Sequence, residues 1–177
     1  ELTGTANYSA VANQFGFAGA APRNNSMFMY TTPNMGGFSG TLGYVAKPDN
    51  GGNAKVDMNL TYANGPLAVA LSYFKVNSQP KGLALGAAYD FGMFKVGLTW
   101  DDSKLKGATD AKRGAWSLPV TAKLGPGTVL LTYTQARDVK AGSTIRDSGA
   151  KMFALGYDYP LSKRTSLGVS YAKLKND

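Results

Sequence analysis

The sequence predicts an all-β protein, folded as an antiparallel up-and-down β-barrel that crosses a membrane. Three observations predict this fold: apolar and polar residues alternate in segment after segment, short and longer connections join these segments in turn, and aromatic residues gather near the segment ends. Alternation with a period of two places apolar side chains on one face of a strand and polar side chains on the other. A barrel wall between lipid and a water-filled interior requires such two-faced strands.

The clearest predicted strand covers residues 55–62, where every even position is apolar and the odd positions hold Lys55, Asp57, Asn59 and Thr61. Nine further segments follow the same period, and no segment follows the 3.6-residue period of an amphipathic helix. In chain order these segments are 26–32, 38–46, 67–73, 83–89, 94–101, 116–120, 129–133, 152–159 and 167–171. The sequence therefore predicts about ten strands within residues 26–174, in a single domain that takes up residues 1–177.

The connections between these strands fall into two alternating kinds. Short connections rich in Gly, Pro and Asn stand at 33–37, 64–66, 90–92, 125–127 and 160–164, and longer polar ones stand at 47–53, 77–81, 102–112 and 138–148. Gly, Pro and Asn favour tight turns for distinct conformational reasons. Tight turns at one end and longer loops at the other end are typical of outer-membrane barrels.

Aromatic residues occupy the two ends of the predicted strands, with Leu, Val and Met between them. Aromatic girdles at both membrane interfaces are a feature of transmembrane barrels. The alternative is that Tyr is simply a good strand residue. The predicted interface residues are Tyr62, Tyr89, Tyr157 and Tyr159 near the short turns, and Tyr44, Tyr73, Trp100, Trp116, Tyr133 and Tyr171 near the long loops.

Composition argues against most enzyme classes. The 177 residues include no Cys and no His, which excludes disulfides, Cys/His zinc sites and His-dependent nucleophiles within this sequence. Asp101 and Asp102 do not form a catalytic pair, because adjacent strand residues point to opposite faces. We therefore expect no enzyme activity, no cofactor and no metal.

The net charge of +8 raises the question of nucleic-acid binding. The basic residues are scattered singly or in pairs, whereas nucleic-acid modules concentrate them on one element. The longest apolar run, residues 66–71, is far shorter than the roughly 18 residues of a membrane-spanning helix. Neither a nucleic-acid partner nor a helical membrane protein is predicted.

Three stretches resemble one known family. They are residues 23–44, with Arg-Asn-Asn-Ser and Thr-Pro-Asn-Met-Gly-Gly-Phe, residues 62–67, Tyr-Ala-Asn-Gly-Pro-Leu, and residues 155–165, which end in Leu-Ser-Lys-Arg-Thr. From about Arg23 to Lys175 the chain resembles the general trimeric porins of Gram-negative outer membranes, most closely the β-proteobacterial type. The resemblance implies a homotrimer of sixteen-stranded barrels, of which this sequence holds the sixth to the fifteenth strand and is an incomplete chain. It also implies that residues 2–23 form a loop that folds inward and constricts the pore.

On this resemblance, the candidate pore residues belong to the loop and to the polar face of the strands. The loop is small and neutral, with Arg23 where it rejoins the wall, and the wall lysines outnumber Asp57, so we expect a preference for anions. For each lysine alone, an ordinary solvated charge is an equal alternative. The candidates are Arg23, Lys55, Asp57, Lys95 and Lys123, and the polar loop residues Asn7, Ser9, Asn13 and Gln14.

Two functions remain open. The first is an outer-membrane channel for passive diffusion of small hydrophilic, preferably anionic solutes, in which outward-facing Lys75, Arg137 and Lys173 meet lipopolysaccharide phosphates or water. The second is a non-channel β-barrel that binds a ligand, either as a soluble carrier or as a surface adhesin or receptor. A soluble carrier would have an apolar interior and would place its polar faces outside.

Overall fold

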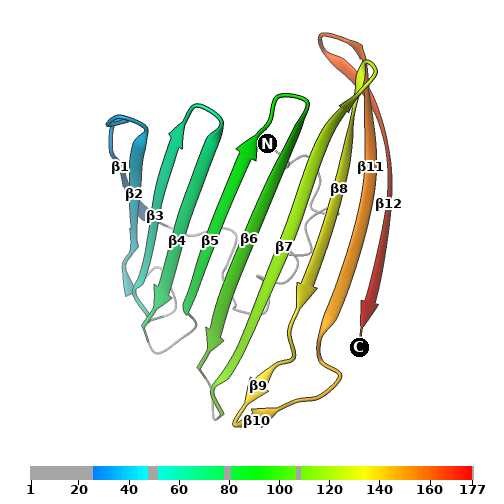
Figure 1. The fold of residues 1–177 in the computed structure, drawn as a ribbon. Coiled ribbons are helices and arrows are strands. Elements are labelled where there is room, and N and C mark those ends of the chain that lie inside the picture. Colours follow the sequence, from blue (N-terminus) through cyan, green and yellow to red (C-terminus); the bar gives the residue numbers. More distant parts are fainter. Residues whose placement is uncertain (1–25, 48–51, 78–80, 107–108, 177) are drawn as a thin grey trace.

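The computed structural model describes residues 26–47, 52–77, 81–106 and 109–176, which form one curved antiparallel sheet (Figure 1). Ten strands follow one another in the order β1-β2-β3-β4-β5-β6-β7-β8-β11-β12, and the short strands β9 and β10 lie off this path. The predicted all-β antiparallel fold is confirmed. The described residues include no helix that could span a lipid bilayer. The strands are β1 (Met27–Thr31), β2 (Phe38–Val45), β3 (Lys55–Asn64), β4 (Leu67–Val76), β5 (Lys81–Asp90), β6 (Phe94–Leu105), β7 (Ala111–Leu124), β8 (Gly127–Ala136), β9 (Lys140–Ala141), β10 (Ser143–Thr144), β11 (Ala150–Ser162) and β12 (Thr165–Asn176).

The tight turns lie together at one end of the sheet and the longer connections at the other (Figure 1). Along the chain, each connection at the tight-turn end is shorter than its neighbours at the opposite end. Gly65 and Gly125 begin two of the turns with φ of 56° and 59°, in the left-handed region that glycine adopts without a steric penalty. Asn34 supports another turn, because its Oδ1 accepts a hydrogen bond from the backbone N–H of Gly37 at 2.9 Å.

Several strands extend further than predicted toward the long-connection end. β6 continues to Leu105 and β7 starts at Ala111, so most of the predicted loop 102–112 is strand. The predicted loop 138–148 contains the two-residue strands β9 and β10, and β9 pairs with β7. The prediction made these strands too short because it required apolar side chains, whereas ladder hydrogen bonds involve only the backbone.

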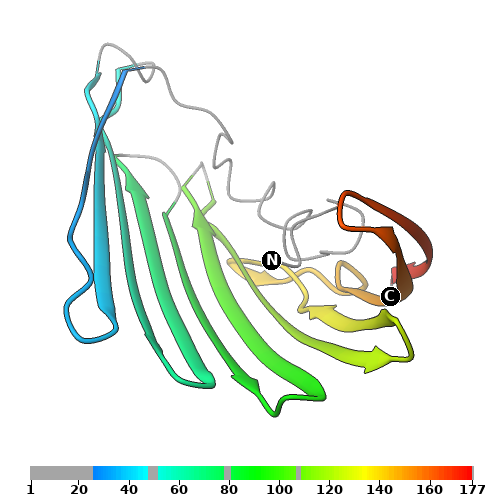
Figure 2. The same cartoon turned by 90° about the horizontal axis from the view of Figure 1, so that it is seen from above.

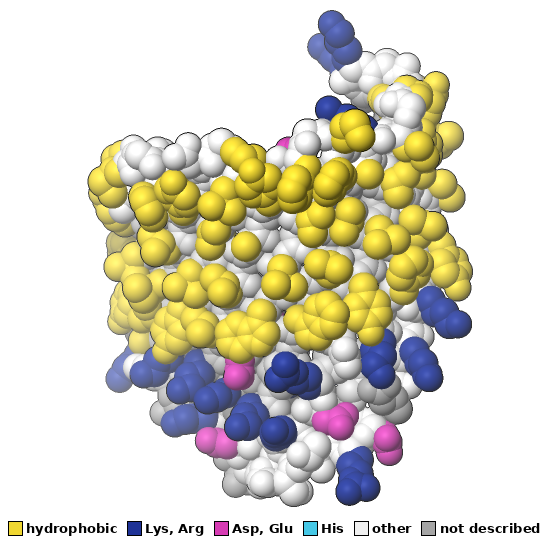
Figure 3. Space-filling model, in the orientation of Figure 1, with side chains coloured by type: hydrophobic (Ala, Val, Ile, Leu, Met, Phe, Trp, Pro, Cys, Tyr) yellow, Lys and Arg dark blue, Asp and Glu magenta, His cyan; other side chains and the backbone are white. Residues whose placement is uncertain are grey.

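The register brings apolar side chains of neighbouring strands into continuous rows on the convex face. One row crosses five strands, with Leu60 opposite Leu71, Leu71 opposite Leu85, Leu85 opposite Trp100 and Trp100 opposite Trp116. Leu60, Leu71 and Leu85 are 51%, 41% and 46% exposed. Together with their neighbours these residues form the broad apolar band of Figure 3.

The described residues contain hardly any apolar core. Their one cluster of buried apolar side chains consists of Met152 and Ala154 on β11. Many large apolar side chains therefore lie exposed on the surface, whereas water-soluble monomers rarely expose large contiguous apolar patches. Such a surface is suited to contact with lipid.

Candidate functional site

The concave face of the sheet, visible as the inside of the trough in Figure 2, carries the alternate set of side chains. Small polar groups on it form hydrogen bonds from one strand to the next. The Oγ atoms of Ser39 and Thr61 are 2.7 Å apart, and Thr134 Oγ1 donates to Ser117 Oγ at 2.8 Å. Because these groups satisfy one another, the wall stays polar without long side chains that would fill the interior.

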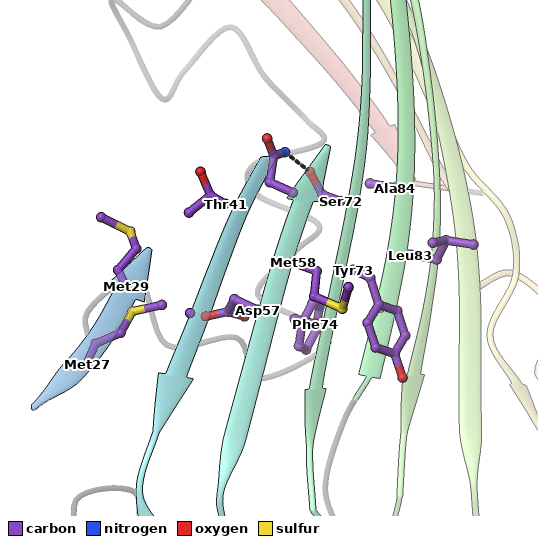
Figure 4. A pocket seen from close by; sticks show the side chains of 13 residues that line it. Met27, Met29, Thr41, Asp57, Met58, Ser72, Tyr73, Phe74, Leu83 and Ala84 are labelled. Carbon is purple, nitrogen blue, oxygen red and sulfur yellow. Dashed lines mark hydrogen bonds between the residues drawn. The ribbon is translucent and has the colours of Figure 1, made fainter. Parts of the chain in front are cut away.

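Asn59 and Ser72 continue this pattern on β3 and β4, since Asn59 Nδ2 donates to Ser72 Oγ at 2.7 Å (Figure 4). They line a depression of about 350 Å³ on the concave side of β1 to β5. Met27 and Met29 stand on one side of it and the Phe74 ring on the other (Figure 4). The depression is thus lined mainly by apolar groups, with Asn59, Ser72 and a few other polar side chains among them.

Lys55 and Asp57 lie on the concave face and form an ion pair. Lys55 Nζ is 3.1 Å from Asp57 Oδ2 at the long-connection end of β3, and Lys55 is only 6% exposed. A carboxylate this close neutralises the lysine for any charge that passes at a distance. Lys55 therefore adds less positive charge to the interior than the sequence suggested.

A second concave charge pair, Asp101 and Arg113, was missed by the sequence analysis. In the register Ser103 faces Arg113 and Asp101 faces Ala115, so Asp101 and Arg113 are diagonal neighbours whose charges attract. Asp101 is 6% exposed, and Arg113 Nη2 donates to the carbonyl of Ser148 at 3.3 Å. The signal was available, because Arg113 has the same parity as Ala115. It was overlooked because the predicted strand began only at residue 116, whereas β7 begins at Ala111.

Lys95 and Lys123 lie on the concave face at the tight-turn end. Lys95 faces Thr121 and Lys123 faces Thr128, so the two lysines are diagonal neighbours on β6 and β7. Together with both threonines they line a small depression of about 130 Å³. Neither lysine forms an ion pair with another described residue.

Two carboxylates share this end of the concave face, so Asp57 is not the only opposing charge. Asp90 faces Lys95 in the register, and its Oδ1 accepts a hydrogen bond from the Gly92 N–H at 2.8 Å. Asp158 of β11 faces Thr128 of β8, and Thr128 in turn faces Lys123 of β7. The described concave face therefore carries basic and acidic residues in similar number.

The other candidates lie on the convex face or outside the described residues. Arg23 and the loop residues Asn7, Ser9, Asn13 and Gln14 belong to the undescribed segment 1–25, as does the predicted constriction loop 2–23. The described part of the chain holds no cluster of three acidic side chains placed to bind a metal ion. All ten predicted interface aromatics fall on the convex parity: Tyr44, Tyr62, Tyr73, Tyr89, Trp100, Trp116, Tyr133, Tyr157, Tyr159 and Tyr171.

Comparison with known proteins gives consistent sequence matches. The family model of the Gram-negative porins matches residues 1–177. Outer membrane porin protein 32 of Delftia acidovorans is 34% identical over 171 residues, which are 87% of this chain and 47% of that protein. An outer membrane porin protein of Bordetella pertussis is 28% identical over 204 residues, covering 85% of this chain and 52% of that protein. The chain thus spans about half the length of these curated relatives.

Two solved structures share the fold. A porin structure refined at 1.8 Å resolution superimposes with a TM-score of 0.69 at 19% identity, over 84% of this chain and 56% of that one. Outer-membrane expressed OmpT of Vibrio cholerae superimposes with a TM-score of 0.74 at 15% identity, over 85% and 54%. At these identities the two structures bear on the fold alone.

Proposed function

We propose, because this chain belongs to the Gram-negative porin family, that the complete protein forms a water-filled channel through which small hydrophilic solutes diffuse passively. The chain lies in the bacterial outer membrane, as the family and its curated relatives do. One observation above all supports the channel: the apolar residues are exposed on the convex face, and small hydrogen-bonded polar residues line the concave face.

A soluble ligand carrier would need the opposite arrangement, with an apolar interior and a polar exterior. The exposed row from Leu60 to Trp116 counts against such a carrier. A surface adhesin or receptor would depend on its loops, and no described loop contact favours that function. The family and the names of the relatives speak for a channel, and we propose no catalytic role.

Within this function we propose a modest preference for anions. Asp57 and Asp101 each have a basic neighbour, Lys55 and Arg113, whereas Lys95 and Lys123 form no ion pair with a described residue. Each of these two exposed lysines would raise the concentration of anions in its immediate surroundings. We expect the preference to be small, because Asp90 and Asp158 share the tight-turn end of the wall.

Further parts of the proposal come from the family resemblance. We propose that residues 2–23 form the constriction, with Arg23 as its charge, and that the complete protein is a homotrimer. The ten convex aromatics would lie at the two membrane interfaces, and Lys75, Arg137 and Lys173 would face lipopolysaccharide. All ten aromatics share a face with the exposed apolar residues, which supports the interface role.

The test is the conductance of the complete protein in planar lipid bilayers. We expect ohmic currents that rise with salt concentration, and in a tenfold KCl gradient a reversal potential whose sign indicates anion preference. A reversal potential with the sign of cation preference would overturn the anion preference only. Absence of any conductance by the folded complete protein would overturn the channel.

A further inference from the structure

Two rows of concave residues on β1 to β5 line the depression that contains Asn59 and Ser72 (Figure 4). In the row nearer the long connections, which we call the first row, the residues that face one another in turn are Met29, Gly43, Asp57, Phe74 and Gly82. In the second row they are Thr41, Asn59, Ser72 and Ala84. The first row thus alternates large side chains with glycines, and the strand register alone brings these residues together.

The two glycines of the first row make room for large side chains that lie across them. A Cβ on Gly43 would overlap the end of the Met27 side chain, and a Cβ on Gly82 would overlap the Phe74 ring. Met27 therefore reaches across β2 and Phe74 across β5, while Met29 stands beside Met27 on β1 (Figure 4). Two thioether sulfurs and one aromatic ring consequently line a single depression.

This depression exposes apolar surface on the face that meets water in the proposed channel. Met29, on the concave face of β1, is 68% exposed. An apolar ligand that covers such a side chain removes it from water, which is favourable. This inference rests on the proposed function in one respect, because it takes the concave face to be the side that solutes reach.

The apolar lining indicates what kind of ligand body fits. Methionine sulfur makes favourable contacts with aromatic rings, and a phenylalanine ring pairs with a second ring in an offset or edge-to-face arrangement. An apolar cavity of about 150 Å³ is large enough for benzene. The depression measures about 350 Å³, so it has room for one aromatic ring together with its substituents.

The polar groups indicate which substituent fits. Asn59 Nδ2 donates to Ser72 Oγ, so Asn59 Oδ1 can accept a hydrogen bond and the Ser72 hydroxyl can donate one. A hydroxyl group on the ligand matches both, because it donates and accepts. The site does not require a charged ligand, because Asp57, which also lines the depression, is paired with Lys55 at 3.1 Å.

We propose that this depression binds small uncharged aromatic solutes that carry a hydroxyl group. The ring would lie between the two methionines and the Phe74 ring, and the hydroxyl group would form a hydrogen bond with Asn59 Oδ1 or with the Ser72 hydroxyl. Conduction requires binding that favours entry yet is weak enough to permit release. A weak site on the wall would therefore concentrate such solutes inside the channel without trapping them.

The experiment measures binding of para-hydroxybenzyl alcohol to the complete protein in lipid nanodiscs by ligand-observed NMR, with empty nanodiscs as the background. We expect saturable binding with a dissociation constant of about 1 mM, in keeping with the small size of the probe. The cyclohexane analogue with the same two hydroxyl groups should bind at least about fivefold more weakly, because it lacks the aromatic contacts with sulfur and with Phe74.

Two variants test the lining residues. Met29→Ser should weaken binding of the aromatic probe by about three- to tenfold, because one sulfur–ring contact and its apolar surface are lost. Met35→Ser is the matched control, since Met35 is an exposed methionine outside the depression, and it should bind like the wild type. Phe74→Leu keeps an apolar side chain but removes the ring, so it should reduce the preference for the aromatic probe by about threefold.

Three results would overturn the inference. The first is the absence of saturable binding by the folded wild type, and the second is equal binding of the aromatic probe and its cyclohexane analogue. The third is equal binding by Met29→Ser and Met35→Ser, with folding checked by heat-modifiable migration, because the probe would then bind elsewhere. Conductance of the same protein tests the proposed function separately. A protein that conducts without binding the probe contradicts only this inference, and one that binds the probe without conducting contradicts only the channel.

Discussion

At the scale of single residues, the effect of a concave-face charge on a passing ion depends on the side chains around that charge. Lys55 is buried against Asp57 at 3.1 Å, whereas Lys95 and Lys123 stand exposed beside the hydroxyls of two threonines. A paired charge is felt as a dipole by a passing ion, and an unpaired charge is felt at full strength until salt screens it. We therefore expect Lys95 and Lys123 to contribute more to ion preference than Lys55.

The double variant K95E/K123E should move the channel toward cation preference. A unit charge about 8 Å from a passing ion contributes about 0.5 kcal/mol in water, and screening at 0.1 M salt reduces this to about 0.2 kcal/mol. Four charge units, acting oppositely on anions and cations, should change the permeability ratio by roughly tenfold. The measurement is the reversal potential in a KCl gradient.

The control for this prediction is K163E/R164E, which makes the same charge change in the β11–β12 turn, outside the channel wall. We expect it to shift the reversal potential by less than half as much. An equal shift in the two variants would mean that net charge, and not position on the concave face, sets the preference.

At the scale of the strands, glycines provide room for large side chains of the neighbouring strand. The Phe74 ring of β4 lies over Gly82 of β5, where a Cβ would overlap the ring. Pro119 of β7 packs in the same way over Gly97 of β6, with its Cγ 3.0 Å from the position of a Cβ. Such pairs cover backbone that a glycine leaves bare and help to fix the register.

The Phe74–Gly82 contact predicts a non-additive pair of substitutions. Phe74→Ala should lower the free energy of unfolding by about 1 kcal/mol, because it uncovers the backbone of Gly82. Gly82→Ala should also destabilise, because its methyl group meets the ring. In the double variant the methyl group finds free space, so we expect a smaller loss than the sum of the two.

This cycle is measured by urea unfolding of the protein in lipid vesicles. Phe74→Leu is the matched control, since a leucine still covers part of Gly82 and should destabilise less than alanine. Additive effects within about 0.3 kcal/mol would show that the two residues do not interact.

At the scale of the whole molecule, the sheet separates two environments. Its convex face carries the apolar rows and its concave face the hydrogen-bonded polar groups, so the molecule is stable only with lipid on one side and water on the other. The sheet formed by the described residues is open, because β1 and β12 each pair on one side only. Unpaired strand edges in hydrocarbon are costly, so we expect both edge strands to find partners in the membrane.

The same separation predicts that the loss of stability caused by introducing a charged residue depends on which face of the sheet carries that residue. Leu85→Arg, in the middle of the apolar band, should destabilise by about 2–4 kcal/mol, as arginine at the bilayer midplane does. Ala84→Arg, one residue earlier on the concave face, should cost less because its side chain reaches water. Urea unfolding in lipid vesicles compares the two variants. A greater cost for Ala84→Arg would contradict the assignment of the two faces.

The sequence by itself determined the features that depend on neighbouring residues only. Alternation within 55–62 identified β3 and its two faces, and the Asn-Gly-Pro stretch located the turn into β4, because strand period and turn chemistry are local. The strands, their order and the faces of Lys55, Lys95 and Lys123 followed from these signals. The ends of β6 and β7 did not, because side-chain hydropathy does not mark where backbone pairing stops.

Only the tertiary structure decided which side chains meet across strands. The position of Arg113 diagonal to Asp101 and that of the Phe74 ring over Gly82 both depend on register, and a shift by one residue would move every side chain to the other face. The register depends on how well many residues from distant parts of the chain pack together. No single segment of the sequence therefore determines it. The sequence thus determined what each face is made of, and the pairing of the strands determined which charges and rings act together.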